Sequence, residues 1–120
     1  MDSVFTYAVA DKTYYADALK VRRILLSHTD GRAWTYVRDI ATIKEDIDSL
    51  NADANIDKEV KEAKLGLARM AVSRLEGILA EAAVTAFEWT PFDPATGDGC
   101  TELTALTVLS EYMEFAAGKG

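Results

Sequence analysis

Few side chains in this chain could support nucleophilic catalysis. His28 is the only histidine and Cys100 the only cysteine. A Cys/His or Ser/His/Asp site needs a base, but His28 stands at the expected end of a short helix, far in sequence from Cys100. A histidine there is usually a C-terminal cap or a surface residue. A cysteine just before a helix can have a lowered thiolate pKa, but more often it is a small buried apolar residue. We therefore predict no catalytic residue.

Oxygen ligands are concentrated between residues 93 and 102. They are Asp93, Thr96, Asp98 and Glu102, and their spacing differs from that of an EF-hand loop. The other interpretation is that Asp93 and Asp98 bond to their own backbone and set the turns. Zinc and iron–sulfur sites need several His or Cys ligands, which the chain lacks. The sequence predicts no metal and no cofactor, with a calcium- or ligand-binding regulatory module as the alternative function of this loop.

Two further kinds of chemistry have weak support. The glycines of residues 93–99 are not followed by the Gly-Lys-Ser/Thr of a phosphate-binding loop, and the segment follows a helix instead of a strand. Acidic side chains such as Asp46, Glu62 and Glu81 fit the solvated faces of amphipathic helices. Neither pattern predicts an active site, and we expect a protein that is not an enzyme.

The charge of the chain is negative and uneven. The formal net charge is -7, which argues against binding duplex DNA or an anionic membrane. Residues 1–40 sum to +1 and residues 41–120 to -8. An acidic balance also simply favours solubility. The asymmetry nevertheless predicts a salt-sensitive, head-to-tail contact between copies, in which Arg22 and Arg23 belong to the basic group.

The elements that hold these residues are predicted to form one domain of 120 residues. We expect a β-hairpin over residues 1–16, a helical region over 17–86, a Pro/Gly-containing loop over 87–100 and a C-terminal helix over 101–117. The fold class is therefore α+β, mainly α, with a hairpin followed by a bundle of about four helices. Asp17, Asp57 and Thr101 are the expected N-caps. Gly118 is the expected terminator of the last helix.

Apolar spacing predicts the buried faces of the helices. The first helix has apolar positions at Leu19, Val21, Ile24 and Leu25. The second has a seam of Tyr36, Ile40, Ile43, Ile47 and Leu50. The stripe of the third is Val60, Ala63, Leu67, Met70, Ala71, Leu75, Ile78 and Ala82, broadened by Leu65, Val72 and Leu79. The last helix presents Leu103, Leu106, Leu109 and Met113. Gly66 and Gly77 predict close approach of another helix or a kink.

Aromatic residues gather in two places that predict contact surfaces. Phe5, Tyr7, Tyr14 and Tyr15 place more aromatic area on a short hairpin than a small domain readily covers, so we expect the hairpin to contact a partner. Trp89 and Phe92 flank the first proline of the loop. We expect them to anchor that apolar loop across the bundle or, failing that, to bind a partner.

The location of the protein also has sequence signals. No stretch has the roughly 18 to 20 apolar residues that a membrane span requires. The first residues lack the basic end and the apolar run of a signal peptide. A single cysteine fits a reducing compartment. We expect no membrane insertion and no secretion by a signal peptide.

The layout of the chain resembles that of small structural and assembly proteins of tailed bacteriophages, including tail assembly chaperones. The residues that carry this resemblance are Val4-Phe5-Thr6-Tyr7-Ala8-Val9 with Lys12-Thr13-Tyr14, then Phe92-Asp93-Pro94-Ala95-Thr96-Gly97-Asp98-Gly99, and Glu111-Tyr112-Met113-Glu114-Phe115. The resemblance implies a non-enzymatic oligomeric protein of the tail or neck, or of virion assembly. It implies the host cytoplasm or the virion as location and further copies or phage structural proteins as partners. A third alternative is an enzyme subunit whose catalytic groups come from a partner.

Overall fold

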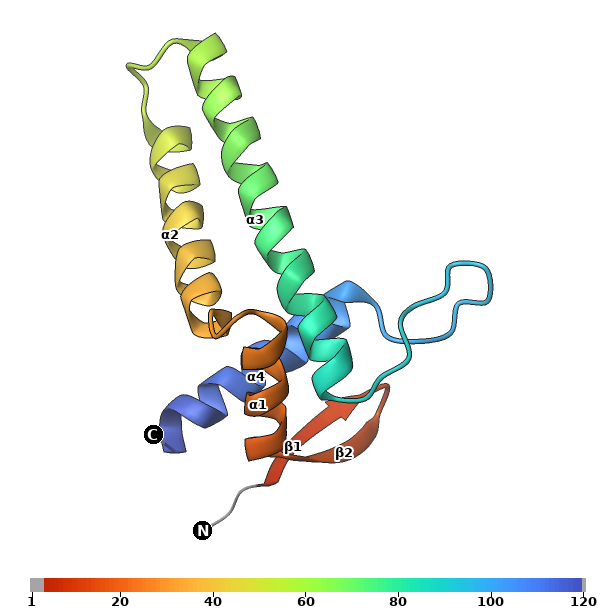
Figure 1. Cartoon of the computed structure of the whole chain (residues 1–120). Coiled ribbons are helices and arrows are strands. Elements are labelled where there is room, and N and C mark those ends of the chain that lie inside the picture. The colour runs from red at the N-terminus through yellow and green to blue at the C-terminus, as the bar shows by residue number, and fades with distance from the viewer. Residues whose placement is uncertain (1–3, 120) are drawn as a thin grey trace.

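The computed structural model describes residues 4–119 and confirms the predicted α+β, mainly α fold class. Strands β1 (Val4–Val9) and β2 (Lys12–Asp17) form an antiparallel hairpin. The helices in this range are α1 (Ala18–His28), α2 (Ala33–Ala52), α3 (Lys58–Ala86) and α4 (Glu102–Lys119). Figure 1 shows a body made of the hairpin, α1, α4 and the end of α3, from which α2 and the rest of α3 project. We call this projection, residues 37–76, the arm.

The hairpin has a two-residue turn without glycine. The register pairs Val4 with Asp17 and Val9 with Lys12. Ala10 and Asp11 between the strands both have positive φ, 52° and 65°, which is the geometry that matches the twist of the two strands. Asp-Gly or Asn-Gly normally fills such a turn, so its amino-acid signal was weak although the hairpin itself was predicted.

The expected N-caps are confirmed. The Asp17 carboxylate accepts hydrogen bonds from the backbone N–H of Leu19 at 2.9 Å and of Lys20 at 3.2 Å. Asp57 accepts from the N–H of Glu59 at 3.3 Å, and the Thr101 hydroxyl oxygen accepts from the N–H of Thr104 at 3.2 Å. Each cap satisfies backbone donors that the first helical turn leaves unpaired. The last helix, however, continues through Gly118 to Lys119 instead of ending at residue 117.

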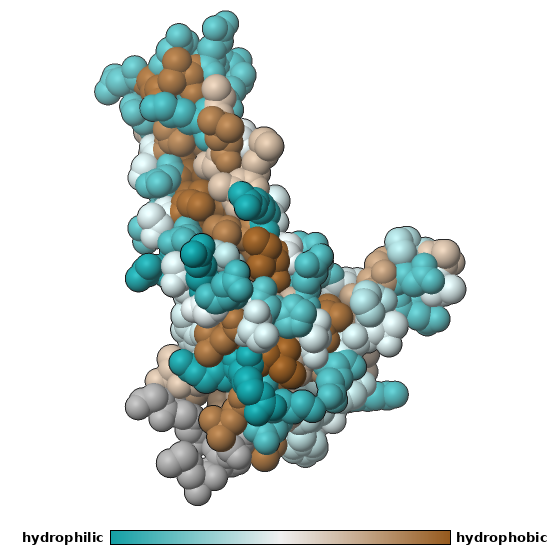
Figure 2. Space-filling model, viewed as in Figure 1, coloured by the Kyte–Doolittle hydropathy of each residue, from teal (hydrophilic) through white to brown (hydrophobic). Residues whose placement is uncertain are grey.

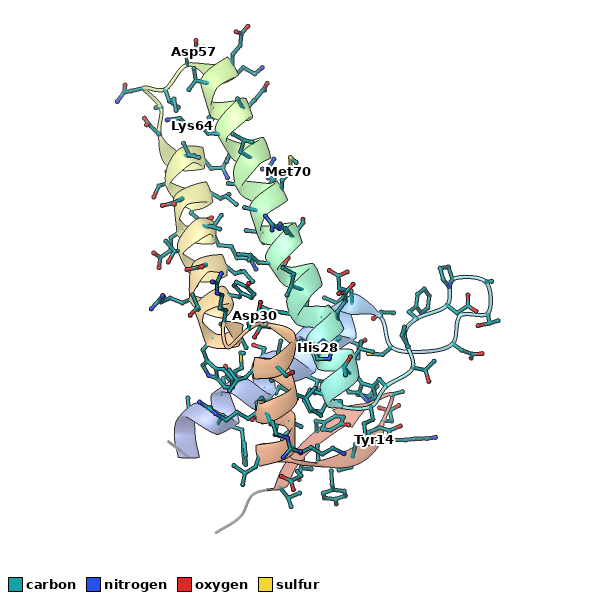
Figure 3. All side chains as sticks on the ribbon, in the orientation of Figure 1. Tyr14, His28, Asp30, Asp57, Lys64 and Met70 are labelled. Atoms are coloured by element: carbon teal, nitrogen blue, oxygen red, sulfur yellow. The ribbon has the colours of Figure 1, made fainter. Side chains whose placement is uncertain are left out.

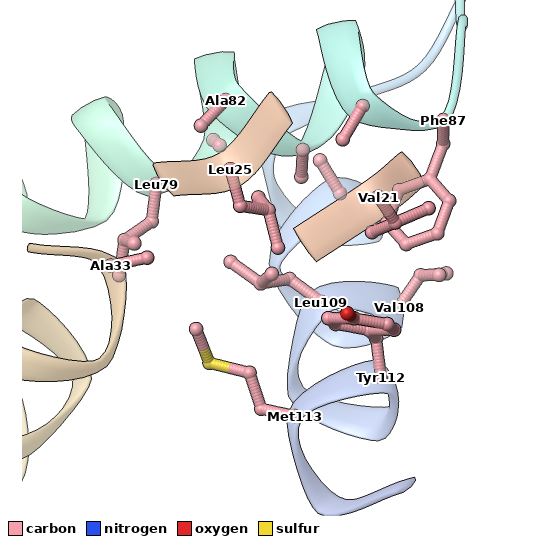
Figure 4. Close-up of a cluster of buried hydrophobic side chains, with 14 of the residues drawn as sticks. Val21, Leu25, Ala33, Leu79, Ala82, Phe87, Val108, Leu109, Tyr112 and Met113 are labelled. Atoms are coloured by element: carbon pink, nitrogen blue, oxygen red, sulfur yellow. The ribbon is translucent and has the colours of Figure 1, made fainter. Parts of the chain in front are cut away.

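The core of the body joins the two ends of the chain. Small residues at the end of α3, such as Ala82, Ala83 and Ala86, are fully or nearly buried and let α1 and α4 approach closely. Figure 4 shows the buried side chains of α1, α3 and α4 meeting between these helices. Tyr112 of α4 lies at the centre, and its hydroxyl donates a 2.8 Å hydrogen bond to the carbonyl of Ala18. The body is therefore held by contacts between distant parts of the sequence.

The arm is thinner, because only two helices form it. Five apolar residues of α2 form a half-buried seam against α3, as predicted, namely Tyr36, Ile40, Ile43, Ile47 and Leu50. Only Ala33 of α2 is fully buried. Lys44 and Glu76 form an ion pair of 3.6 Å between the two helices. No third helix packs against α2 and α3 in the arm. Each of the two helices therefore keeps a solvent-facing side along most of the arm.

The predicted buried faces of three helices need correction. On α3, Val60, Leu67 and Met70 are 44%, 69% and 69% exposed. Leu65, Val72 and Leu79, which were predicted to broaden the stripe, are buried, as are the predicted Ala82 and other alanines of the last two turns. The third helix has two apolar stripes on different sides, and only one of them meets α2. On α4 and α1, Leu103 and Leu19 are exposed as well, at 76% and 70%.

The loop before α4 is closed at its base. The N–H of Cys100 donates to the Thr90 carbonyl at 2.7 Å, and Pro91 and Cys100 form a β-bridge. Gly99 has φ 93°, and a Cβ there would collide with the Pro91 carbonyl. Residues 90–99 are exposed, and Figure 1 shows the loop projecting away from the body. The expectation that this apolar segment packs on the bundle was wrong beyond Trp89.

Candidate interaction surfaces

Two of the predicted contact residues lie in the core. Phe5 and Tyr7 are 3% and 5% exposed, and both point from β1 toward α4 and the end of α3. The Phe5 ring lies 5.5 Å from that of Tyr112 and 6.1 Å from that of Phe87. A two-stranded hairpin cannot bury these rings on its own. Here α4 and the end of α3 bury them. These rings hold the hairpin to the body and are not free to contact a partner.

The tyrosines of β2 are exposed to different degrees. Tyr14 is 39% exposed and stacks on Tyr7 with 5.5 Å between ring centroids. Tyr15 points to the other face of the hairpin and is 72% exposed. Figure 3 shows Tyr14 on the hairpin. Of the four hairpin aromatics, Tyr15 is the one with most of its surface available to a partner.

Trp89 and Phe92 have different environments. Trp89 is half-buried, stacks on Phe87 at 4.9 Å and meets Tyr7 edge-on at 5.5 Å. It holds the start of the loop against the hairpin and the end of α3, whereas we expected it to anchor the loop across the bundle. Phe92 is 43% exposed and belongs to the projecting loop. Phe92 therefore does not anchor the loop, and its ring is available at the surface.

The basic residues of the first 40 positions are partly engaged within the chain. The Arg22 guanidinium carbon lies 4.4 Å from the centroid of the Trp34 ring, a cation–π contact. Lys20 pairs with Glu88 at 2.8 Å. Arg23 is exposed. Basic charge is also not confined to this part of the chain. Residues 58–74 contain Lys58, Lys61, Lys64, Arg69 and Arg74 against Glu59 and Glu62, a net of +3.

Cys100 and His28 lack the environment of a catalytic pair. Burial raises the pKa of the Cys100 thiol, whereas a nucleophilic cysteine needs a lowered one. Its sulfur lies 3.4 Å from the carbonyl oxygen of Thr101. His28 is exposed in the last turn of α1. Cys100 therefore fits the interpretation as a small, partly buried apolar residue.

The acidic loop uses its polar groups on its own backbone. The Asp93 carboxylate accepts from the N–H of Ala95 at 2.9 Å, and the Thr96 hydroxyl accepts from the N–H of Asp98 at 3.3 Å. Within residues 4–119 no group of three or more His, Cys, Asp or Glu side chains is placed to hold a metal ion. The turn-forming interpretation of Asp93 is the one with hydrogen bonds to support it.

An apolar groove lies where the arm meets the body. Its volume is about 450 Å³, and it is lined mainly by Trp34, Val37 and Ile40 of α2, Leu79 of α3, and Leu106, Leu109 and Met113 of α4. The groove could not be predicted from residue spacing, because its lining comes from three separate helices. Leu67, Met70 and Leu103 were also missed as surface residues. Figure 2 shows apolar side chains, in brown, continuing from the body along the arm.

The two buried tyrosines predict sensitivity to alkaline pH. Burial raises the pKa of the phenols of Tyr7 and Tyr112 above their usual value of about 10. The stabilisation that the neutral phenols provide is complete below that value and is lost as pH rises through the folded-state pKa. We expect the free energy of unfolding, from denaturant melts, to fall above about pH 10, and to fall less in Tyr112→Phe. An identical loss in both proteins would contradict this.

In the described part of the chain no helix is long and apolar enough to cross a bilayer. Comparisons with protein-family models, curated proteins and solved structures found no match. No relative therefore supplies a role for any of these residues.

Proposed function

We propose that this chain is a non-enzymatic protein–protein interaction module that acts through oligomeric packing, as a structural protein of a bacteriophage tail or neck or in virion assembly. The observation that carries the interaction role is the excess of surface. The chain exposes 8039 Å² for a mass of 13.1 kDa, whereas a compact monomer of that mass exposes roughly 6,400 Å². Its radius of gyration of 16.8 Å likewise exceeds the ~14 Å of a compact domain.

The exposed surface also has the composition of a contact surface. Tyr15, Leu19, Leu67, Met70 and Leu103 are each 69% to 76% exposed. Single exposed apolar residues are ordinary, but such a set on an elongated chain is typical of proteins that complete their packing in an assembly. The bacteriophage assignment is supported by the resemblance in layout described above.

The test of this function is the native complex. We would tag the chain at its C-terminus in its native source, isolate it under gentle conditions and identify the associated proteins by mass spectrometry. Virion structural proteins or assembly intermediates are expected. Isolation with an enzyme, or stable association with nothing but copies of itself, would contradict the assembly role. Added calcium is the control for the alternative module, because an ion that binds only the folded protein raises its melting temperature.

The proposed assemblies should weaken with salt. Raising NaCl from roughly 0.05 to 0.5 M shortens the Debye length several-fold, so the average mass in sedimentation should fall. Arg23→Glu with Arg32→Glu removes two exposed charges of the basic group and spares Arg22, which stacks on Trp34. We expect this variant to form smaller assemblies at low salt.

The control for that experiment is Lys58→Glu with Arg69→Glu. It makes the same change in net charge on exposed residues of α3. Equal effects of the two double variants would indicate a response to net charge alone and would contradict a specific basic contact. A mass that is independent of salt would contradict it as well.

A further inference from the structure

The outer side of α3 carries an apolar stripe that no other part of the described chain covers. Val60, Ala63, Leu67 and Met70 recur at spacings of three and four, as in the seam between two paired helices. The three larger side chains are 44%, 69% and 69% exposed. Figure 3 shows Met70 pointing away from α2. We call these four residues, together with Arg74 and Gly77 at the next two positions of the same repeat, the outer stripe.

The outer stripe is separate from the side of α3 that packs in the monomer. At 100° per residue, it lies about 170° around the helix from Leu65, Val72 and Leu79, which face the other way and are buried. The arm contains only α2 and α3, so α2 cannot reach both sides. The apolar residues of the outer stripe are thus free for a second molecule.

The glycines of α3 also favour a partner helix on this side. Gly66 and Gly77 each cost on the order of 1 kcal/mol relative to alanine inside a helix. A Cβ added at either position would meet nothing within 4 Å. The close helix approach that these glycines predict therefore does not occur within residues 4–119. Gly77 belongs to the outer stripe and Gly66 borders it.

We propose that the outer stripe binds the outer stripe of a second copy, with the two α3 helices antiparallel about a two-fold axis that passes between Leu67 and Met70. In this register Leu67 packs against Met70 of the second copy. Val60 lies opposite Gly77, and Ala63 lies under the aliphatic stem of Arg74. Large residues thus meet small ones away from the axis, and every pair occurs twice, as a two-fold contact requires.

Charge favours the antiparallel direction. Glu59 and Arg74 lie at opposite ends of the outer stripe, and neither forms an ion pair with another residue in 4–119. The antiparallel pair brings Glu59 within about one helical turn of Arg74 in the second copy. A parallel pair would instead place Arg74 beside Arg74 and Glu59 beside Glu59, which repel each other. Opposite charges therefore meet only in the antiparallel arrangement.

The available area is sufficient. With its 8039 Å² of accessible surface, the chain exposes roughly 1,600 Å² more than a compact monomer. A stable interface of standard size removes about 800 Å² from each partner. The α3 pair can thus form and leave surface for the assembly contacts of the proposed function. The first partner of the chain is thus a second copy of itself, whether or not the protein belongs to a bacteriophage.

The first test is the oligomeric state of purified wild type and of Leu67→Glu with Met70→Glu, by sedimentation equilibrium at 0.5 M NaCl, where the charge-driven contacts are screened. We expect a wild-type dimer. In the variant, burying unpaired carboxylates should raise the dimer dissociation constant at least about a hundredfold. Both residues are exposed in the monomer, so the helical circular dichroism and the melt of the separated chain should persist.

The matched control is Leu103→Glu, which places a carboxylate on an equally exposed leucine of α4. It should leave the dimer intact. A monomeric wild type, an unaffected Leu67→Glu/Met70→Glu protein, or equal losses in this control would each overturn the proposal.

The second test concerns direction. Arg74→Glu should weaken the dimer about tenfold by facing Glu59 of the second copy, and adding Glu59→Arg should restore most of the affinity. Absence of rescue would overturn the antiparallel register. These readouts separate the inference from the proposed function, because a dimer that binds no virion protein contradicts only the function, and a monomer that binds one contradicts only the inference.

Discussion

Tyr112→Ala should lower the free energy of unfolding by about 3 to 5 kcal/mol, the range for truncating a buried large aromatic residue. The ring is 1% exposed and lies edge-on to Phe5 at 5.5 Å and to Trp34 at 6.4 Å. Removing it opens a cavity at the place where the hairpin, α1 and α4 meet. Denaturant melts followed by circular dichroism measure the loss.

Two companion variants separate packing from hydrogen bonding at this position. Tyr112→Phe keeps the ring and loses only the bond to the Ala18 carbonyl, so it should cost about 1 kcal/mol. Tyr15→Ala removes a ring that is 72% exposed and should change stability little. If Tyr112→Phe were as damaging as Tyr112→Ala, the ring contacts would not be the main source of stability.

Gly99→Ala should have the second large effect, at least about 2 kcal/mol. The residue has φ 93°, and the new Cβ would collide with the carbonyl of Pro91. The two segments at the base of the loop cannot move apart easily, because the N–H of Cys100 donates a 2.7 Å hydrogen bond to the Thr90 carbonyl. Differential scanning calorimetry measures the loss.

Gly97→Ala is the matched control for this prediction. Gly97 also has a positive φ, 76°, but a Cβ there would meet nothing within 4 Å. Its cost should be limited to the left-handed backbone, about 1 kcal/mol. Equal losses in the two variants would mean that the contact with Pro91 does not constrain the loop.

Local signals in the sequence predicted the elements well. A cap such as Asp17 and the regular apolar seam of α2 depend on residues a few positions apart. Both can therefore be predicted from the sequence alone. The turn at Ala10 and Asp11 was weaker, because neither residue is the glycine or asparagine that such a geometry favours. Its strands were still evident from their β-branched and aromatic residues.

Contacts between distant segments were not predictable in the same way. The pattern of α3 contains two apolar stripes, and nothing near Leu67 in sequence shows that α2 lies on the opposite side. Phe5 and Tyr7 were predicted to face a partner, because the residues that bury them, Phe87 and Tyr112, lie 80 or more positions away in the sequence. Residue spacing predicts that an apolar side chain will be buried. Only the tertiary structure shows which distant residues bury it.

The separation of body and arm has a consequence for the order of folding. The arm joins α2 to the helix that follows it directly, whereas the body joins Ala18 to Tyr112, 94 residues apart. Closing so long a loop costs more entropy than pairing neighbouring helices. We expect the arm to form early in synthesis and to shorten the path between the two halves of the body. Until α4 emerges from the ribosome, the apolar face of the hairpin has no cover and is the segment most in need of protection from aggregation.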